Sequence, residues 1–434
     1  KNRLFRNEYH QDRPEAGFSD VTGEAGVAGD PAAWSSSAAW IDYDNDGDLD
    51  LLVANYIRWS KDIDLDQNYT LVGVGRAYGP PTHFAGSHPY LYRNEGNGHF
   101  VDVTHAAGLK ITNEATGLPM AKSLGLAPVD LDSDGWIDIL IANDTVRNLV
   151  FHNRGDGTFE EIGVVAGIAY DSTGQARGAM GVDTLRFGAQ GDGHGDLAVG
   201  IGNFSNEMTA FYCTHGDPLL FSDDAIATGI GPRTRLVLTF GLLFFDSDLD
   251  GRRDLLAVNG HLEEDISRVQ ESQHYRQSAQ LFFNVGGSAR IRFVPATETE
   301  LGPDFFTPLV GRGATYADID ADGDLDLLLT QIAGPPRLLR NDQALRRHWI
   351  RLKLVGHRSN RSAIGARVRV QFGKRVVHRQ VMPTRSYLSQ VELPVTVGLG
   401  EQTGVDKITI HWPGGEVQTL ADIPIDCETT IAQE

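Results

Sequence analysis

An acidic motif of nine residues, D-x-D-x-D-G-x-x-D, occurs four times in this chain of 434 residues and constrains the fold more than any other feature. The copies begin at Asp42, Asp130, Asp246 and Asp318. Together they hold 18 aspartates, nearly as many as the formal net charge of −20. Carboxylates crowded so closely repel one another unless a cation neutralises them. The repeat therefore predicts metal sites.

The spacing of the carboxylates favours Ca²⁺. This ion binds six to eight oxygens at about 2.3–2.6 Å, whereas Mg²⁺ prefers few carboxylates and several waters. Side chains at positions one, three, five and nine and the carbonyl of position seven can converge when glycine at position six permits a sharp turn. We expect about four structural Ca²⁺ ions. The predicted ligands are Asp42, Asp44, Asp46, Asp48 and Asp50; Asp130, Asp132, Asp134, Trp136 and Asp138; Asp246, Asp248, Asp250, Arg252 and Asp254; and Asp318, Asp320, Asp322, Asp324 and Asp326.

The EF-hand is the alternative that the sequence can test. An EF-hand needs a bidentate Glu at position twelve and a helix on each side of its loop. Position twelve is occupied here by Val53, Ile141, Ala257 and Leu329, and position nine leads directly into short apolar runs. Such runs are typical of buried strands. The loops are therefore predicted to connect strands in an all-β protein.

A second motif alternates with the acidic loops. Residues 91–100 read LYRNEGNGHF and residues 150–159 read VFHNRGDGTF, with looser copies at 4–7, 281–284 and 338–341. Asn-x-Gly-x-Gly between β-rich runs indicates a hairpin. Units of four strands that repeat every 40–70 residues or so predict a β-propeller. Five blades are legible, and the N-terminal half-unit leads us to expect six or seven.

One acidic loop is degenerate. Between the second and third complete copies, Gly188 and Gln190 stand where carboxylates are expected, and Asp192 and Asp196 follow. The sequence leaves open whether this loop binds Ca²⁺.

The repeats resemble the FG-GAP/VCBS repeats of integrin-type propellers, and the C-terminal segment resembles the ASPIC/UnbV module. The second likeness rests on HWIRLKLVG at 348–356, SNRSAIGARV at 359–368, SYLSQ at 386–390, GLG at 398–400 and HWPGG at 411–415. Together the two likenesses cover almost the whole chain, as in bacterial homologues of cartilage acidic protein. They imply an integrin-type propeller at residues 1–341 and a small β-sandwich-like domain at residues 342–434. Cysteines that the family pattern places in the insertion at residues 56–88 are lacking.

The C-terminal segment is basic although the whole chain is acidic. Residues 340–385 contain thirteen Lys or Arg and one acid. Alternation places Arg351, Lys353, Arg367 and Arg369 on one face of their strands. This face is predicted either to lie against solvent or the acidic propeller, or to bind a polyanion such as an acidic glycan, lipid headgroups or an acidic protein.

Amides recur five residues after position nine of each loop. Strand geometry carries these residues roughly 16 Å from the loops, to the opposite face of the propeller. Two interpretations remain open: the amides cap strand ends, or they form a polar ring that binds ligand at the channel mouth. The candidate ligand-binding residues are Asn55, Asn143, Asp144, Asn259, His261 and Gln331.

Composition and motifs limit the function. The net charge of −20 argues against nucleic-acid binding, and the longest apolar run, residues 236–245, is about half of what a membrane helix needs. Cys213 and Cys427 allow at most one disulfide, and no leader is visible. No nucleophile elbow, zincin or phosphate-loop motif occurs in a credible context.

The prediction is a calcium-binding, non-catalytic module for binding or adhesion to a protein or glycan. The resemblance implies a secreted, periplasmic or cell-surface location. It also implies an alternative, because one branch of the family occurs in enediyne biosynthetic clusters: an enzyme or accessory protein that uses the channel mouth. An open channel with a perturbed acid–base pair would favour the alternative, and a filled channel would count against it.

Overall fold

Strands are the main regular secondary structure of the computed structural model, which describes residues 2–9, 17–188, 195–286, 292–343 and 345–434. The helices within these ranges are short and lie in connections between strands. They are α1 (Thr22–Ala25), α2 (Lys61–Gln67), α3 (Gly231–Thr234), α4 (Ile266–Val269), α5 (Glu298–Leu301), α6 (Pro303–Phe306) and one 3-10 helix (Pro81–His83).

Five antiparallel sheets follow one another along the chain, and neighbouring strands in each sheet are joined in sequence order. The first sheet holds β3 (Ala33–Ile41), β4 (Asp50–Arg58), β7 (Tyr90–Asn94) and β8 (Phe100–Asp102). The second holds β9 (Ser123–Val129), β10 (Asp138–Asn143), β11 (Leu149–Asn153) and β12 (Phe159–Glu161). The third holds β13 (Ala179–Phe187), β14 (Asp196–Asn203), β15 (Ala210–Thr214) and β16 (Phe221–Asp223). The fourth holds β17 (Thr239–Phe245), β18 (Asp254–Asn259), β19 (Gln280–Asn284) and β20 (Phe293–Pro295), and the fifth holds β21 (Gly311–Ala317), β22 (Asp326–Gln331) and β23 (Arg337–Leu339).

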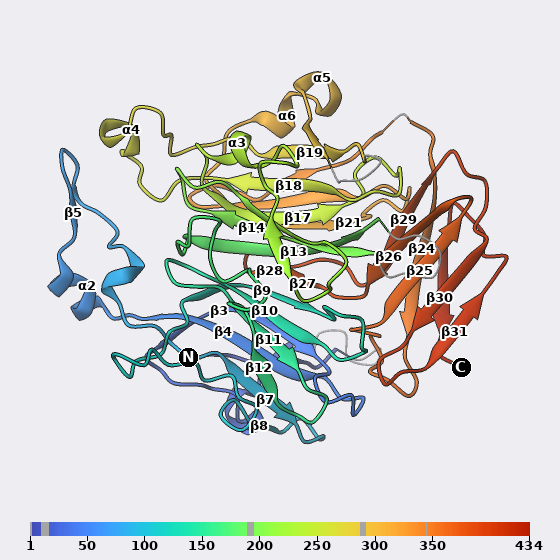
Figure 1. The fold of residues 1–434 in the computed structure, drawn as a ribbon, viewed down its shortest axis with the longest axis horizontal. Helices are drawn as coiled ribbons and strands as arrows, with labels where there is room; N and C mark the ends of the chain where they lie inside the picture. The colour runs from blue at the N-terminus through green and yellow to red at the C-terminus, as the bar shows by residue number, and fades with distance from the viewer. Residues whose placement is uncertain (1, 10–16, 189–194, 287–291, 344) are drawn as a thin grey trace.

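The sheets pack face to face as the blades of a β-propeller. Their first strands lie side by side in the order β3, β9, β13, β17 and β21. Apolar side chains of adjacent sheets share cores; Leu140 of the second sheet and Val199 of the third belong to one cluster. Figure 1 shows the sheets following one another from the blue strands at the bottom to the yellow strands at the top. The predicted propeller is confirmed, but the described residues form five such sheets, and the predicted count of six or seven is not confirmed.

Glycines let the first strands approach one another closely. Three consecutive first strands each carry a glycine whose added Cβ would lie closer than 3.0 Å to a backbone oxygen of the next first strand. The pairs are Gly125 with Met180, Gly181 with Phe240, and Gly241 with Arg312. A side chain at these positions would push two blades apart at the axis.

Two further sheets form the C-terminal domain. One has the order β29 (Val395–Gly400), β24 (His348–Val355), β32 (Glu428–Ala432), and the other has the order β26 (Arg375–Gln380), β25 (Arg367–Phe372), β30 (Lys407–His411), β31 (Val417–Leu420). Ile350, Val368, Val397 and Ile410 contribute to one core between them. The predicted sandwich-like domain is thus present, and Figure 1 shows it in red beside the ends of the propeller strands.

A hairpin of the C-terminal domain enters the propeller. It consists of β27 (Thr384–Arg385) and β28 (Ser389–Gln390), which Figure 1 shows among the central strands. The Ser386 backbone N–H donates to Val182 O at 2.8 Å, and the Thr315 hydroxyl donates to Gln390 O at 2.6 Å. An added Cβ at Gly313 of β21 would meet the hairpin, as the other inner glycines meet a strand. The hairpin therefore fills the propeller axis.

Two small strand pairs complete the chain. β1 (Phe5–Asn7) pairs with β2 (Phe18–Asp20), and β5 (Thr70–Leu71) pairs with β6 (Gly75–Arg76). The second pair belongs, with α2, to an insertion that projects on the side away from the C-terminal domain in Figure 1.

Candidate metal centres

The first aspartate of every complete loop has one oxygen that is bonded and one that is not. Its Oδ2 accepts the N–H of the loop glycine, at 3.2 Å from Gly47 to Asp42, 3.0 Å from Gly135 to Asp130, 3.0 Å from Gly251 to Asp246 and 3.2 Å from Gly323 to Asp318. Its Oδ1 is buried in all four loops, with no donor among the described residues. A buried carboxylate oxygen without a partner is costly, and a bound cation supplies that partner.

The first aspartate of each loop lies close to further carboxylates. One oxygen from each of Asp42, Asp44 and Asp50 lies within 4.8 Å of the others, and the corresponding residues of the second and fourth loops do the same. The third loop groups Asp246 and Asp248 with Asp250. Ligands on opposite sides of a Ca²⁺ ion are separated by about 5 Å, so the donor set fits this ion.

The carboxylate at position nine ties the loop to the second motif. In the first loop, Asp50 Oδ2 accepts the N–H of Tyr43 at 3.3 Å, and its Oδ1 accepts the N–H of Asn94 at 2.8 Å. The Asn94 amide then donates to Leu49 O and accepts the N–H of Gly96. The bond from the motif asparagine to position nine recurs at Asn153, Asn284 and Asn341. This hydrogen bond joins these four copies of the second motif to the acidic loops, which accounts for the alternation of the two motifs.

Burial and mutual repulsion raise the pKa values of the loop carboxyl groups. Burial, followed by Asp46 and Asp44, raises the pKa of Asp42 to about 7, and burial raises that of Asp50 to about 8. Burial raises the pKa of Asp130 to about 6 and that of Asp246 to about 7, although Arg367 and Arg379 respectively oppose the shift. A divalent cation would stabilise the charged form of each group instead.

We expect the metal-free chain to be less stable at pH 8 than at pH 5. Asp42 and Asp50 have pKa values of about 7 and 8 in the fold, against about 3.9 for an unfolded aspartate. The folded state therefore binds more protons than the unfolded state, and the free energy of unfolding falls as pH rises from about 4 to 8. Melting of the metal-stripped protein across this range measures the slope. Saturating Ca²⁺ should abolish it, and a metal-free Tm that climbs steadily to pH 8 would contradict the prediction.

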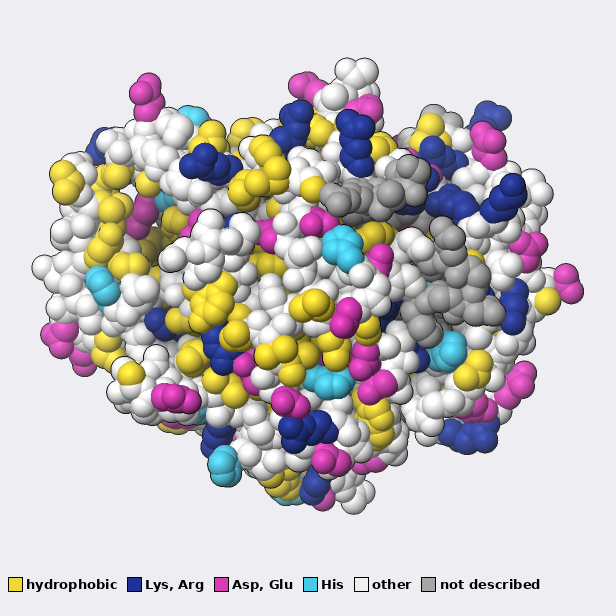
Figure 2. Space-filling model, in the orientation of Figure 1, with side chains coloured by type: hydrophobic (Ala, Val, Ile, Leu, Met, Phe, Trp, Pro, Cys, Tyr) yellow, Lys and Arg dark blue, Asp and Glu magenta, His cyan; other side chains and the backbone are white. Residues whose placement is uncertain are grey.

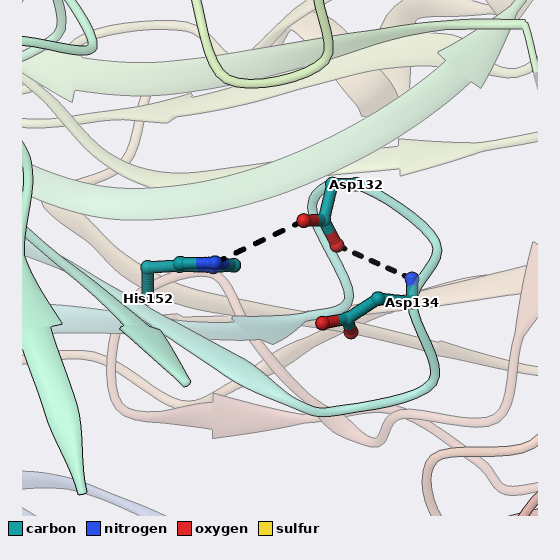
Figure 3. A group of neighbouring side chains, drawn as sticks. All are labelled: Asp132, Asp134 and His152. Carbon is teal, nitrogen blue, oxygen red and sulfur yellow. Dashed lines mark hydrogen bonds and ion pairs between the residues drawn. The ribbon is translucent and has the colours of Figure 1, made fainter. Parts of the chain in front are cut away.

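A histidine of β11 lies against the second loop. His152 Nδ1 lies 2.9 Å from Asp138 Oδ1, and its Nε2 lies 3.9 Å from Asp132 Oδ2. Figure 3 shows the ring directed toward Asp132, with Asp134 nearby. Hydrogen bonding to Asp138 raises the pKa of His152 to about 9, against the opposing effect of burial. His152 occupies position three of the second motif. Arg340 occupies the same position in a later copy, and it lies 3.8 Å from Asp320 of the fourth loop. A basic residue at this position is therefore the sequence signal for such a contact.

The degenerate loop falls largely outside the described residues. Gln190 and Asp192 belong to that part, while Asp196 Oδ1 accepts the N–H of Gly216 at 3.0 Å. Calcium binding by this loop stays an open question of the sequence.

The predicted polar ring consists of buried amides and a few side chains near the far mouth. Asn55, Asn143 and Asn259 are fully buried, and each amide donates to a backbone carbonyl, those of His88, Arg147 and Ser278. These bonds match the interpretation that the amides cap strand ends. The role of this set in ligand binding stays a prediction.

The other ring residues differ in exposure. Asp144 and His261 are buried, and Gln331 is half-buried with its amide donating to Pro335 O. The Tyr56 hydroxyl donates to Asp144 at 2.6 Å. Burial raises the pKa of Asp144 to about 6 and lowers that of His261 to about 4.

Exposed aromatic side chains lie beside Tyr56. Trp34 is 50% exposed and Trp59 is 43% exposed. The Trp34 ring meets Tyr56 and Trp59 edge to face, with centroids 5.9 and 5.7 Å away. The sequence analysis missed this group, because only the fold brings residues 34, 56 and 59 to one place.

The basic strand face of the C-terminal domain turns mostly inward. Arg351 is buried and bonds to Glu392 at 2.5 Å and Glu428 at 3.0 Å. Arg369 is buried, Arg367 lies 2.7 Å from Asp130 of the second loop, and Lys353 is exposed. These contacts match the interpretation that the sheet packs beside the acidic propeller. Over the C-terminal domain, the visible face in Figure 2 shows side chains of both charges interspersed.

All four metal loops contact the C-terminal domain. Added Cβ atoms at Gly47, Gly251 and Gly323 would meet Arg358 O, Gly398 O and the Trp349 ring. Further contacts join Arg367 to Asp130, Arg379 to Asp246, and Arg347 to Asp248 at 2.6 Å. The loops thus lie at the junction of the two domains.

The cysteines and the helices bear on two further sequence predictions. Cys213 and Cys427 do not pair; Cys213 is buried and Cys427 is half-buried. Among the described residues, no helix has the length and hydropathy needed to cross a membrane.

Two family models match separate parts of the chain. Residues 356–434 match the family described as ASPIC and UnbV, and residues 130–186 match an FG-GAP-like repeat. Cartilage acidic protein 1 of Homo sapiens is 29% identical over 288 residues, which cover 64% of this chain and 39% of that protein. The Mus musculus protein of the same name is 27% identical over 325 residues, covering 73% and 44%. The chain spans less than half the length of these relatives.

Solved structures with a similar arrangement of strands include the V. cholerae biofilm matrix protein Bap1 and an Aleuria aurantia lectin. The first has a TM-score of 0.32 and 11% identity, over 91% of this chain and 61% of that one. The second has a TM-score of 0.32 and 9% identity, over 90% and 96%.

Proposed function

Because the chain combines an FG-GAP-repeat β-propeller with a C-terminal ASPIC and UnbV domain, we propose that it is a calcium-binding, non-catalytic module that presents a surface to a protein or glycan outside the cytoplasm. About four Ca²⁺ ions hold its loops and its domain junction in one geometry. The metal is structural and takes no part in chemistry.

The unpaired buried oxygen in each loop carries the proposal. Asp42, Asp130, Asp246 and Asp318 each have a buried Oδ1 without a donor among the described residues, and each belongs to a group of three neighbouring carboxylates. The chain supplies three or more anionic ligands and a turn glycine at each site, and Ca²⁺ supplies the compensating charge. Millimolar extracellular Ca²⁺ fills sites of moderate affinity, which supports a place outside the cytoplasm.

The position of the loops explains what the metal does for binding. The loops contact the C-terminal domain, so four bound ions fix both the blade hairpins and the neighbouring domain. Free energy of metal binding then stabilises the whole two-domain unit. A rigid surface loses less entropy when it meets a partner.

The mouth opposite the C-terminal domain is the proposed binding face. Trp34 and Trp59 expose aromatic faces beside the bonded pair of Tyr56 and Asp144. Exposed aromatic rings next to polar groups suit the apolar faces and hydroxyls of sugars, and they also anchor protein partners.

The filled axis supports binding over catalysis. Ser386 bonds to β13, and the Tyr387 ring meets Phe240 edge to face with centroids 4.9 Å apart. The alternative function in secondary-metabolite biosynthesis requires a deep channel pocket, and the hairpin occupies that space.

The number of bound ions tests the proposal. We expect about four Ca²⁺ per chain by elemental analysis after dialysis, and one fewer in Asp44→Ala, because each loop supplies its own ligands. Asp156→Ala, an exposed aspartate in a glycine turn, is the matched control and should keep every ion. A chain that binds no Ca²⁺, or a variant that loses all ions together, would contradict independent loop sites.

A further inference from the structure

A cavity of about 310 Å³ lies between the propeller and the C-terminal domain. Its propeller wall comes from β9, β13 and the second and third acidic loops, and its other wall comes from β25, β26, β30 and the base of the inserted hairpin. The volume is within the range of small-molecule sites. Exposed Lys407 and half-buried Ser133 lie at its rim, which gives it a path to solvent.

The lining carries a large excess of positive charge. Of the described residues, six arginines and one lysine line the cavity, against two carboxylates. The arginines are Arg186, Arg253, Arg367, Arg369, Arg379 and Arg385. So many cations around one low-dielectric space repel one another unless an anion lies among them.

The two carboxylates of the lining already have partners. Asp183 bonds to Arg385 at 3.0 Å and also accepts the N–H groups of Phe244 and Thr184. Asp130 faces Arg367 at 2.7 Å and accepts the N–H of Gly135. They therefore offset the charge of Arg385 and Arg367, and neither forms an ion pair with Arg253.

Among the described residues, Arg253 has no ion-pair partner. Its residue is only 8% exposed, and its Nε has no acceptor among the described residues. None of the described carboxylates forms an ion pair with it, whereas Arg379 has Asp246 at 3.6 Å. The buried amide nitrogen of Gln380, in the same wall, also lacks an acceptor. Both residues belong to the lining of this cavity, and each of these nitrogens requires an oxygen acceptor.

We propose that this cavity binds a phosphate or sulfate group, with Arg253 as its central ligand. A guanidinium group offers paired N–H donors that match a tetrahedral oxyanion, and a multiply charged anion offsets several cations at once. The group is either a free ion or the head of a small phosphorylated or sulfated molecule. The site is separate from the aromatic mouth, and its occupant helps to hold the two domains together.

The test uses the full chain loaded with Ca²⁺ and freed of excess metal. Inorganic phosphate, sulfate and glucose 6-phosphate are each titrated while Tm is recorded, with sodium chloride at equal ionic strength and glucose as controls. We expect phosphate or sulfate to raise Tm by about 2 °C or more at millimolar concentration. A response to glucose 6-phosphate as well assigns the site to an anionic group on a small molecule, and a response to the inorganic ions alone assigns it to a free ion.

The Arg253→Met variant distinguishes anion binding in this cavity from a general effect of salt on Tm. Without added anion, the variant should melt at the same or a higher temperature, because an uncompensated buried charge is gone. Its response to phosphate should vanish, while its Ca²⁺ content stays unchanged. Arg154→Met, in an exposed turn, should respond as the original chain does. Arg253→Lys, which keeps the charge without the paired donors, should bind phosphate about tenfold more weakly. The proposal would be overturned if neither inorganic anion raised the Tm of the native chain, or if phosphate still raised the Tm of Arg253→Met.

Discussion

Removal of Ca²⁺ should lower the melting temperature by about 10 °C or more. Each ion that binds only the folded state stabilises it by about 3–4 kcal/mol when present at 100 to 1,000 times its Kd. Four loops share this dependence, and each retains a buried, unpaired Oδ1 once the ion is gone. Differential scanning calorimetry in excess EGTA at pH 8, with and without added Ca²⁺, measures the loss.

The same removal should loosen the domain junction. Arg347 bonds to Asp248 of the third loop, and exposed Arg346 precedes it. We therefore expect trypsin to cut after Arg346 or Arg347 several times faster in EGTA than in Ca²⁺. Mg²⁺ at equal concentration should restore little of the lost stability, because it accepts few carboxylates. If neither the melting curve nor the trypsin cleavage rate changed in EGTA, a structural role for the metal would be contradicted.

Gly181→Ala should destabilise the chain by about 3 kcal/mol. The new Cβ would lie closer than 3.0 Å to the Phe240 carbonyl oxygen, and it would also crowd the backbone of Ser386 in the inserted hairpin. Both neighbours are backbone atoms fixed by hydrogen bonds between strands, so neither can move away from the new methyl group. The change places one methyl group between two blades and the hairpin.

Gly404→Ala is the matched control, because an added Cβ there meets nothing within 4 Å. It should alter stability by less than about 1 kcal/mol, and in the stabilising direction. Urea unfolding of both variants in Ca²⁺ measures the difference. Equal stability of the two variants would show that the blades are not packed as closely as the structure places them.

The acidic loops could be predicted from the sequence because all their ligands lie within nine residues. Local spacing fixed the turn, the absence of a glutamate at Val53 excluded the EF-hand, and the apolar residues that follow fixed the strand. The alternation of the two motifs was visible as well. Its cause was not, since the bond from Asn94 to Asp50 crosses 44 residues.

Features that depend on distant partners could not be predicted. Alternation placed Arg367 on a strand face, but only the fold shows that this face meets Asp130. His152 follows Phe151 in a strand that returns beside the loop, so its carboxylate neighbours precede it by 14 and 20 positions. The cavity at Arg253 joins residues from both domains, and no local pattern marks it.

The propeller cannot be completed until the inserted hairpin, which follows all five blades in the chain, has been synthesised. Thr384 donates to Ala38 O across 346 residues, and Ser386 bonds to Val182 across about half the chain. The axis of the propeller is completed by residues that follow all five blades in the chain, so the early blades must wait for them during synthesis. Contacts this distant in sequence make folding slow, because the entropy cost of closing a long loop comes before the contacts that stabilise it. The two domains should consequently unfold in a single cooperative step, and a nascent chain that stops before residue 380 has no means of completing its propeller.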